Sequence, residues 1–330
     1  MKRGNIGIFI PHLGCPHACL FCDQHAISGT KKAPDADEVR ALLHKAIEDR
    51  EKAGSTVPCE IAFFGGSFTA IDRAYMLSLL DAANEFAPYF QGIRVSTRPD
   101  GIDETVLSVL KEKGVTAIEL GVQSMDDRVL SLCGRGHTSA DTVNASRLIR
   151  SFGIGLGHQM MTGLPGDTDD GARDTAEKII ALSPDTVRIY PTLVLRGTPL
   201  EKMWQSGTYR PQTLESAVSL CADLIERFEA NGVRVIRAGL HSAGVPDSFK
   251  AGPFHPAFGE LCENALYLRA AERAITETPA FSGILSVAKG ELSKLIGQHR
   301  QNLLSLETTA GFKITVREDE RLSPREVKAE

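Results

Sequence analysis

Short apolar runs and amphipathic helical patterns alternate along the chain from residue 5 to about 240, and this alternation constrains the fold more than any other feature. Six runs rich in Ile, Val and Phe have the length and composition of β-strands. They are IGIFI (6–10), IAFFGG (61–66), IRVSTRP (93–99), VTAIELGVQS (115–124), IGLGHQMMTGLPG (154–166) and TVRIYPTLV (186–194). Six strand-then-helix units in series predict a parallel sheet with right-handed crossovers.

The segments between these runs have helical spacing and end in glycine. In residues 36–54 the apolar positions are Val39, Leu42, Leu43, Ala46 and Ile47, and in residues 214–232 a similar face is followed by Gly232. Gly114, Gly153 and Gly232 each stand directly before a β-branched residue, in GVTAI, GIGLG and GVRVI. This repetition predicts left-handed glycine caps that end a helix and lead into a strand.

Polar and glycine-rich segments follow nearly every strand, which favours a barrel-like sheet whose loops share one mouth. We therefore predict an α/β fold, a partial (β/α)6 TIM-like barrel with a small C-terminal α+β appendage. The expected domains are residues 1–245 for the barrel and 246–330 for the extension.

Composition excludes several classes of protein. A formal net charge of −5 argues against a highly basic nucleic-acid binder, and seven cysteines in 330 residues are too dilute for a disulfide scaffold. The apolar run near the N-terminus is too short for a signal peptide, and no run reaches the length of a membrane span. We expect a cytoplasmic protein with reduced thiols and no membrane partner.

Three cysteines, Cys15, Cys19 and Cys22, form a C-x-x-x-C-x-x-C pattern directly after the first predicted strand. Thiolates bind zinc, copper or iron–sulfur clusters. A structural zinc site needs four ligands, and His12, His17 or His25 would have to supply the fourth. A cluster with four irons, held by three cysteines, would instead leave one iron open to a small molecule with chelating amino and carboxylate groups.

With this cysteine pattern the segment 5–240 resembles the radical S-adenosylmethionine (SAM) superfamily. The resemblance implies that Cys15, Cys19 and Cys22 hold a 4Fe-4S cluster whose fourth iron is chelated by SAM. It also implies that reductive cleavage of SAM yields a 5′-deoxyadenosyl radical, and that Phe21, just before the third cysteine, packs near the adenine.

Further segments in the correct order narrow the resemblance. FFGGSF (63–68) matches the glycine pair that receives the SAM amino group in this family. STRPDG (96–101), ELGVQS (119–124), RGHT (135–138), GLPGDT (163–168) and IYPTLVLRGTPLEKMW (189–204) look like the radical SAM half of the Elongator catalytic subunit. GVQS and GLPG also occur in oxygen-independent coproporphyrinogen oxidases.

The resemblance carries a set of SAM-pocket positions over to this chain. His137 and Tyr190 are candidates to face substrate, with a structural hydrogen bond as the alternative for each. The positions expected to contact SAM are Gly65, Gly66, Ser67, Ser96, Arg98, Gln123, Arg135 and Gln159.

The C-terminal extension departs from the Elongator pattern, because no acetyltransferase domain is expected after the barrel. We therefore expect a short bacterial form. The acetyl transfer of the Elongator catalytic subunit is not carried over to this chain. Residues 281–317 predict a strand, short helix, tight loop, helix and strand that resemble a degenerate KH RNA-binding segment. Gly297 matches the first glycine of its G-x-x-G loop, and Arg300 replaces the second. The segment is mildly basic, and residues 317–330 are expected to be a solvated, partly disordered end. His241, His255 and Glu260 are further candidates, with packing or capping roles as the alternative.

The leading hypothesis is a radical SAM enzyme that acts on an unidentified substrate linked to tRNA and accepts electrons from a reductase or a ferredoxin- or flavodoxin-type donor. One alternative is a radical SAM oxidoreductase for a porphyrinogen or other small molecule. A second is a non-catalytic iron–sulfur protein that binds RNA or acts as a sensor.

Overall fold

The computed structural model describes residues 4–15, 19–24, 29, 32–240 and 245–330. These residues form two compact units. The barrel unit comprises Met1–Gln212 and Phe228–Pro253, and the C-terminal unit comprises Thr213–Arg227 and Phe254–Glu330.

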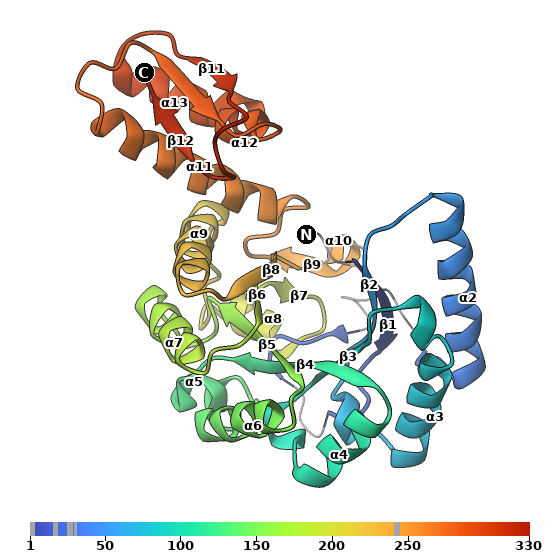
Figure 1. The fold of residues 1–330 in the computed structure, drawn as a ribbon. Helices are drawn as coiled ribbons and strands as arrows, with labels where there is room; N and C mark the ends of the chain where they lie inside the picture. The colour runs from blue at the N-terminus through green and yellow to red at the C-terminus, as the bar shows by residue number, and fades with distance from the viewer. Residues whose placement is uncertain (1–3, 16–18, 25–28, 30–31, 241–244) are drawn as a thin grey trace. The chain divides into compact units, whose positions relative to one another are not determined.

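The barrel unit is built on one curled sheet of seven parallel strands within the described residues (Figure 1). Neighbours in the sheet follow the order β1-β2-β3-β4-β5-β6-β8, and every pairing is parallel. The strands are β1 (Gly4–Ile10), β2 (Cys59–Gly65), β3 (Ile93–Thr97), β4 (Val115–Gln123), β5 (Gly155–Thr162), β6 (Thr186–Pro191) and β8 (Arg234–Ala238).

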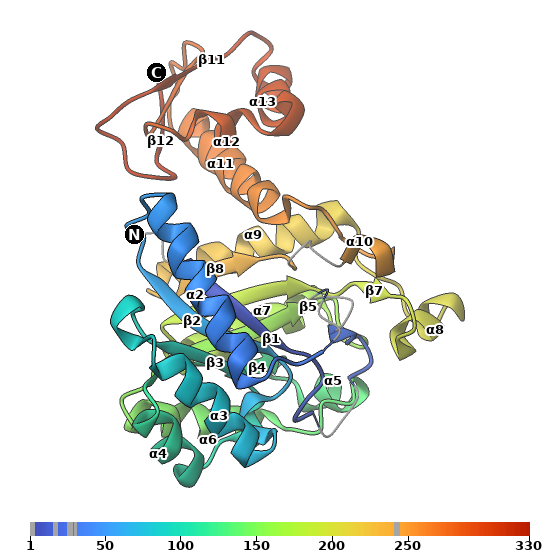
Figure 2. The ribbon, with the colours of Figure 1, turned by 90° about the vertical axis from the view of Figure 1, so that its right-hand side faces the viewer.

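Helices surround the outside of the curled sheet, as Figures 1 and 2 show. A second small sheet pairs β7 (Val194–Leu195) with β9 (Phe249–Ala251). The helices of the barrel unit are α2 (Ala36–Lys52), α3 (Arg73–Asn84), α4 (Glu104–Glu112), α5 (Asp127–Leu132), α6 (Ser139–Ser151), α7 (Asp169–Ala181), α8 (Pro199–Gln205) and α10 (Val245–Ser248), whereas most of α9 (Leu214–Ala230) belongs to the C-terminal unit. Short 3-10 turns are η1 (Phe68–Ala70), η2 (Ala87–Tyr89) and η3 (Pro99–Gly101).

This architecture confirms the predicted partial barrel, with one difference. β1 and β8 are each paired on one side only in the described sheet, so it is not closed. We expected six strands, whereas β8 adds a seventh after Gly232. Its sequence, RVIRA, is not one of the six apolar runs, but Gly232 in GVRVI predicted that a strand follows there.

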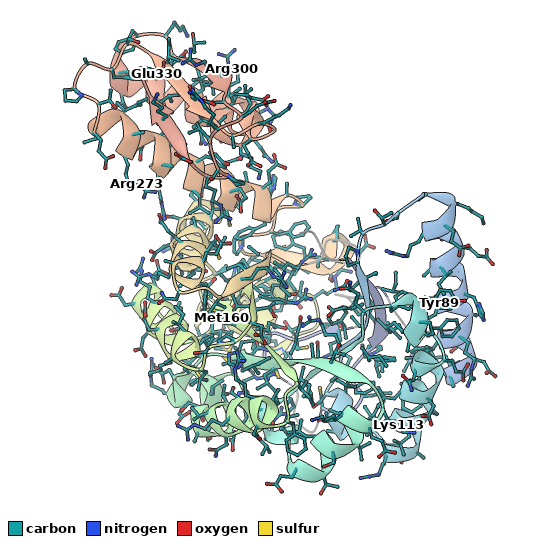
Figure 3. All side chains as sticks on the ribbon, in the orientation of Figure 1. Tyr89, Lys113, Met160, Arg273, Arg300 and Glu330 are labelled. Carbon is teal, nitrogen blue, oxygen red and sulfur yellow. The ribbon has the colours of Figure 1, made fainter. Side chains whose placement is uncertain are left out.

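The strands alternate between an apolar outer face and a polar inner face. In β4, Ile118, Leu120 and Val122 are fully buried, while the alternate positions are Glu119 and Gln123. Met160 of β5, labelled in Figure 3, is likewise fully buried. Because residues i and i+2 share one face of a strand, the helices cover the apolar face and the polar residues are left to line the inside of the curl.

The helix boundaries follow local signals in the sequence. Asp35 and Glu38 form a capping box at the start of α2. Gly114, Gly153 and Gly232 all have left-handed backbone conformations, with φ of 76°, 71° and 74°, which confirms the predicted caps. The apolar face predicted for α2 is narrower than expected, since Val39 and Leu43 are buried but Leu42 is 38% exposed.

The C-terminal unit contains a long helix and a three-stranded sheet of order β11-β10-β12. β10 pairs parallel with β11 and antiparallel with β12, and Leu285 and Val287 of β10 are buried among apolar helix residues. The predicted order of strand, short helix, turn, helix and strand is confirmed. The elements after residue 253 are α11 (Phe258–Thr276), β10 (Ile284–Val287), α12 (Leu292–Ile296), η4 (Gln298–Arg300), α13 (Gln301–Ala310), β11 (Thr315–Glu318) and β12 (Val327–Ala329).

The expectation of a partly disordered end is wrong. β12 continues the sheet, and the backbone of Glu330 exchanges hydrogen bonds with Ile284 while also accepting one from Ser282 N. Arg325 forms an ion pair with Glu263 of α11. The charged residues of this end misled the prediction, because an edge strand needs only alternate apolar positions, here Val327 and Ala329.

None of the helices among the described residues is long and apolar enough to cross a membrane.

Candidate active site

A cavity of about 410 Å³ lies on the inner face of the barrel unit, and it collects most of the residues expected at the site. Because the loops after parallel strands emerge at one edge of the sheet, residues far apart in sequence meet there. The predicted positions that line the cavity are Cys15, Phe21, Cys22, Gly65, Gly66, Ser96, Arg98, Gln123, Arg135 and Gln159. Cys19 and Ser67 are buried and do not line it.

The cysteine loop, residues 12–24, follows β1 and brings its thiols to the cavity. Cys15 and Cys22 line the cavity, whereas Cys19 is 8% exposed and accepts a hydrogen bond from Arg135 Nη1 at 3.2 Å. Burial raises the pKa of Cys15, and burial raises that of Cys22 to about 12, with neighbouring thiols adding to both effects. The Arg135 charge acts in the opposite direction on both thiols, so this arginine favours the thiolate form that a metal requires.

The histidine of this loop that the structure describes has a structural role. His12 Nε2 accepts from Gln24 N at 3.0 Å, and Gln24 Oε1 accepts from His12 N, so the two residues close the base of the loop. The other zinc candidates, His17 and His25, lie outside the described residues. Within the described ranges no three His, Cys, Asp or Glu side chains are grouped so that they could hold one metal ion.

The glycine pair after β2 is required by the close approach of the cysteine loop. A Cβ at Gly66 would lie 1.9 Å from Leu13 O, and one at Gly65 would lie 2.7 Å from Ile10 O. The backbone is joined there by Gly66 N to Ile10 O at 2.7 Å and by Ser67 N to Leu13 O at 2.9 Å. These glycines therefore hold the cysteine loop against the end of β2.

Polar side chains from β4 and β5 form one wall. Gln123 has φ of 66°, which is unusual for a residue with a side chain, and its Oε1 accepts from Gln159 Nε2 at 3.2 Å. Arg135 Nη2 donates to Gly121 O at 2.6 Å, and its Nε is buried without a hydrogen-bond partner among the described residues.

A second arginine approaches from the end of β3. Arg98 Nε and Nη2 donate to the two carboxylate oxygens of Asp100 at 2.9 and 2.8 Å. Its Nη1 is buried and has no hydrogen-bond partner in the described part of the chain. Ser67, also expected to contact the cofactor, is fully buried with its Oγ 2.9 Å from Thr97 Oγ1.

A network of ion pairs lies deeper on the inner face. Arg94 pairs with Glu60 at 2.9 Å and with Glu119 at 3.4 Å, and Arg188 Nε donates to Glu119 at 2.9 Å. Glu119 and Arg188 line the cavity. Apolar content identifies the strands but does not reveal these charged residues. The available signal was their spacing, since each stands on the same strand face as a predicted site residue.

Of the remaining candidate residues, one lines the cavity and the others described here make structural contacts. Tyr190 lines the cavity, whereas His137 does not, and His137 Nε2 contacts Val122 O at 3.3 Å. Burial, with Arg135 next, lowers the pKa of His137 to about 4. His255 Nδ1 accepts from Ala257 N at 3.1 Å just before α11, and His241 lies outside the described residues.

Two protein-family descriptions match the chain. That of the radical SAM superfamily matches residues 9–179, and that of a radical SAM C-terminal domain matches residues 184–267. The first match spans more than half of the chain and contains all three clustered cysteines.

Individual relatives are similar over only part of their own length. The tRNA uridine(34) acetyltransferase of Methanocaldococcus jannaschii is 30% identical over a match covering 62% of this chain and 45% of that protein. The heme chaperone HemW of Bacillus subtilis is 24% identical over 66% of this chain and 59% of its own. The solved structure of Elp3 from Methanocaldococcus infernus, lacking its residues 1–46, has a TM-score of 0.64 at 25% identity and covers 83% of this chain and 64% of that one. The chain thus spans less than two thirds of each of these proteins.

Proposed function

The chain belongs to the radical SAM superfamily and is one of its enzymes, and we propose that it binds a 4Fe-4S cluster and SAM in the cavity and acts on a substrate linked to tRNA. The observation that carries this proposal is the placement of the cysteine loop. Cys15 and Cys22 open onto a cavity whose walls supply donors suited to an amino acid ligand, and Cys19 is held by Arg135.

The residues present fit both groups. Three thiols are one fewer than a closed cubane needs, which leaves one iron for a ligand with amino and carboxylate groups. Arg98 Nη1 and Arg135 Nε are buried donors without partners in the described residues, and a carboxylate oxygen is the acceptor that such donors bind most strongly. When bound, the cluster supplies the electron for reductive cleavage of SAM, which gives a 5′-deoxyadenosyl radical able to take hydrogen from a substrate.

The chain's own residues would bind and orient the cluster and SAM and would shield them from water. Arg135 donates to Cys19 Sγ and Gly121 O, so it couples the cysteine loop to β4. Gln123 and Gln159 present amides for the polar part of a nucleoside. Phe21 packs with Tyr190 against the apolar group around Met161, and this wall excludes water from one side of the cavity.

The test of the cofactor chemistry is direct. Protein reconstituted anaerobically with iron and sulfide, then given dithionite and SAM, is expected to release 5′-deoxyadenosine. Cys19→Ala should abolish this release, whereas Cys59→Ala, which removes a buried thiol of β2 outside the cavity, should retain it. A protein that forms a good cluster but leaves SAM intact would instead be a binding or sensing protein.

The substrate part of the proposal is supported by the tRNA uridine(34) acetyltransferase among the relatives. Nucleoside profiles of total tRNA, with and without the gene, are expected to differ in one modified uridine. Unchanged profiles would contradict a role in tRNA modification. The cellular electron donor, a reductase or a ferredoxin- or flavodoxin-type protein, is replaced by dithionite in the assay above and stays a prediction, as does the cytoplasmic location.

The second candidate is a small-molecule substrate of the porphyrinogen type, favoured by the similarity to a heme chaperone. Incubation with coproporphyrinogen, SAM and reductant distinguishes the two candidates. Consumption of the tetrapyrrole, together with unchanged tRNA, would favour this one.

A further inference from the structure

Two arginines stand side by side on the inner face of the sheet, at the edge opposite to the strand that leads into the cysteine loop. Arg188 of β6 is the register partner of Arg237 of β8, and both line the cavity. Neither was expected at the site. Like charges directly opposite each other on neighbouring strands destabilise a sheet unless something neutralises them.

Arg188 is held rigidly but keeps donors free for a ligand. Its Nε donates to both oxygens of Glu119, at 3.1 and 2.9 Å, and its guanidinium lies 5.1 Å from the centre of the Phe64 ring. Nη1 reaches only the Tyr190 hydroxyl, at 3.5 Å. Because Arg carries five N–H donors in a planar fork, the outer edge of this group remains available.

Glu119 cannot neutralise both arginines. It is already shared between Arg188 and Arg94, and Arg94 also pairs with Glu60. Two cations and two anions thus form a network with no net charge. This network leaves no negative charge over for Arg237.

Arg237 has no acidic partner. Its Nε and Nη2 donate to the backbone oxygens of Gly239 and Leu240 at 3.0 and 3.4 Å, and no Asp or Glu of the described residues forms an ion pair with it. The residues outside the described ranges include no Asp or Glu at all. The other cavity arginines each have a counterpart, Asp100 for Arg98 and the Cys19 sulfur for Arg135.

We propose, on the basis of the proposed function, that Arg188 and Arg237 bind an oxyanion of the substrate, a phosphate or a carboxylate group. Both groups offer two oxygens to a pair of planar donors. The carboxylate of SAM does not account for this pair, since Arg98 Nη1 is a buried donor for it near the cysteine loop. The substrate is therefore anionic, and its charged end is anchored at β6 and β8.

Calorimetric titration with pyrophosphate and with succinate, at constant ionic strength set by chloride, tests the site in both the purified and the reconstituted protein. We expect saturable binding of at least one probe. Binding of pyrophosphate alone would identify the substrate's oxyanion as a phosphate group, and binding of succinate alone would identify it as a carboxylate. Binding of both probes would identify a site that recognises negative charge. Arg237→Gln should weaken this binding at least about tenfold, as expected for a hydrogen bond to a charged group.

Two variants and one chemical measurement serve as controls. Arg234→Gln makes the same change in charge at an exposed position of the same strand and should bind like the wild type. Arg237→Lys should bind more tightly than Arg237→Gln. Modification of Arg237 by phenylglyoxal, followed by mass spectrometry on the wild-type chain, should be slowed by the probes and does not depend on any variant folding.

Several results would overturn the proposal. In the titrations, these results are the absence of saturable binding and equal binding of the probe by Arg237→Gln and Arg234→Gln. In the modification experiment, it is a phenylglyoxal reaction at Arg237 that the probes do not slow. In the reconstituted protein, it is displacement of the probe by saturating SAM. Failure of the proposed function is separate from these. If SAM is not cleaved while probe binding still depends on Arg237, the anion site stands and the radical chemistry is rejected.

Discussion

Arg135 joins the cysteine loop to β4 through one side chain. It donates to Cys19 Sγ and to Gly121 O and keeps a buried, unpartnered Nε. At the scale of single residues this is the contact that most directly sets the electrostatics of the sulfur ligands. Hydrogen bonds to cluster sulfurs and nearby charge both set the potential of an iron–sulfur cluster.

We predict that Arg135→Gln shifts the reduction potential of the reconstituted cluster to more negative values, by on the order of 60 mV or more. The shift follows because the variant loses a positive charge and a hydrogen bond worth at least about 1.4 kcal/mol, and that energy corresponds to about 59 mV for one electron. A redox titration followed by electron paramagnetic resonance measures it. Arg128→Gln, which removes an exposed arginine bonded to Gly166 O, is the matched control. Equal potentials in both variants would contradict the role given to Arg135.

His158 makes stability depend on pH. Its ring is fully buried on the outer face of β5 with Nε2 2.9 Å from Ser146 Oγ, and burial, with Arg150 adding, lowers its pKa to about 3. The unfolded chain binds a proton at this residue near pH 6.5, so acid favours unfolding. We predict that the free energy of unfolding falls by about 1.4 kcal/mol per pH unit from this group as the pH drops from 6.5 toward 3.

Urea unfolding of the cluster-free protein between pH 7.5 and 4.5 tests this. The wild type should lose about 2.3 kcal/mol relative to His158→Gln between pH 6.5 and 4.5, and only about 0.4 kcal/mol between pH 7.5 and 6.5. Parallel stability curves for the two proteins would show that the histidine is not the titrating group.

At the scale of elements, the cysteine loop packs closely against the end of β2. Gly14 of the loop lies so close to the residues after β2 that a Cβ on it would be 2.2 Å from Ser67 O. Since protein interiors have little spare room, such contacts cannot relax by moving a flexible side chain.

We predict that Gly66→Ala displaces the cysteine loop, lowers the free energy of unfolding by about 1–3 kcal/mol, and strongly reduces iron retained after reconstitution. Iron and sulfide analysis together with urea unfolding measures both effects. Gly153→Ala is the control, because it places a Cβ in open space at a left-handed cap. It should cost about 1 kcal/mol and keep its iron. Full iron content in Gly66→Ala would show that the loop tolerates the extra atom.

In the KH-like segment, residues 281–317, the sequence pattern predicts the order of the elements but not the backbone conformation of the turn between the helices. The order of its helices and strands was predictable from apolar spacing. Its turn, however, places both His299 and Arg300 in left-handed conformations, with φ of 50° and 62°. Arg300 thus adopts the backbone that a second glycine would have favoured, at a cost of about 1–2 kcal/mol.

At the scale of the whole molecule, the charge of the C-terminal unit is largely neutralised by its own acids. Lys289, Lys294, Lys313 and Arg317 form ion pairs with Glu320, Glu291, Glu307 and Glu330. The mildly basic composition of residues 281–317 therefore overstates the positive charge available to RNA phosphates. Paired cations release few counterions on binding.

We predict that Arg300→Glu leaves retention of tRNA at moderate salt within about twofold of Arg321→Glu, a matched charge reversal at an exposed site in the same unit. The expectation follows from the ion pairs around the KH-like segment. Filter binding at two salt concentrations measures it. A selective loss in Arg300→Glu, with a shallower salt dependence, would instead place RNA on the G-x-x-G-like loop.

The order of elements along the chain was determined by the sequence itself. Apolar strands, helical spacing, and Gly114, Gly153 and Gly232 act over a few residues, so they can be read without knowing the fold. The cysteine pattern was equally local, because ligand spacing is set within one loop. Composition alone misjudged β12, whose charged residues hide a strand that is defined by its neighbour in the sheet.

The tertiary structure decided what faces the cavity. Curling of the sheet places Glu119, Arg188 and Arg237, which come from three strands, on the inner face. Among the described residues it leaves Arg237 without an acidic partner. It also moved Ser67 and His137 out of the cavity lining. These outcomes depend on register between strands, and register is set by the packing of many distant residues rather than by any segment read alone.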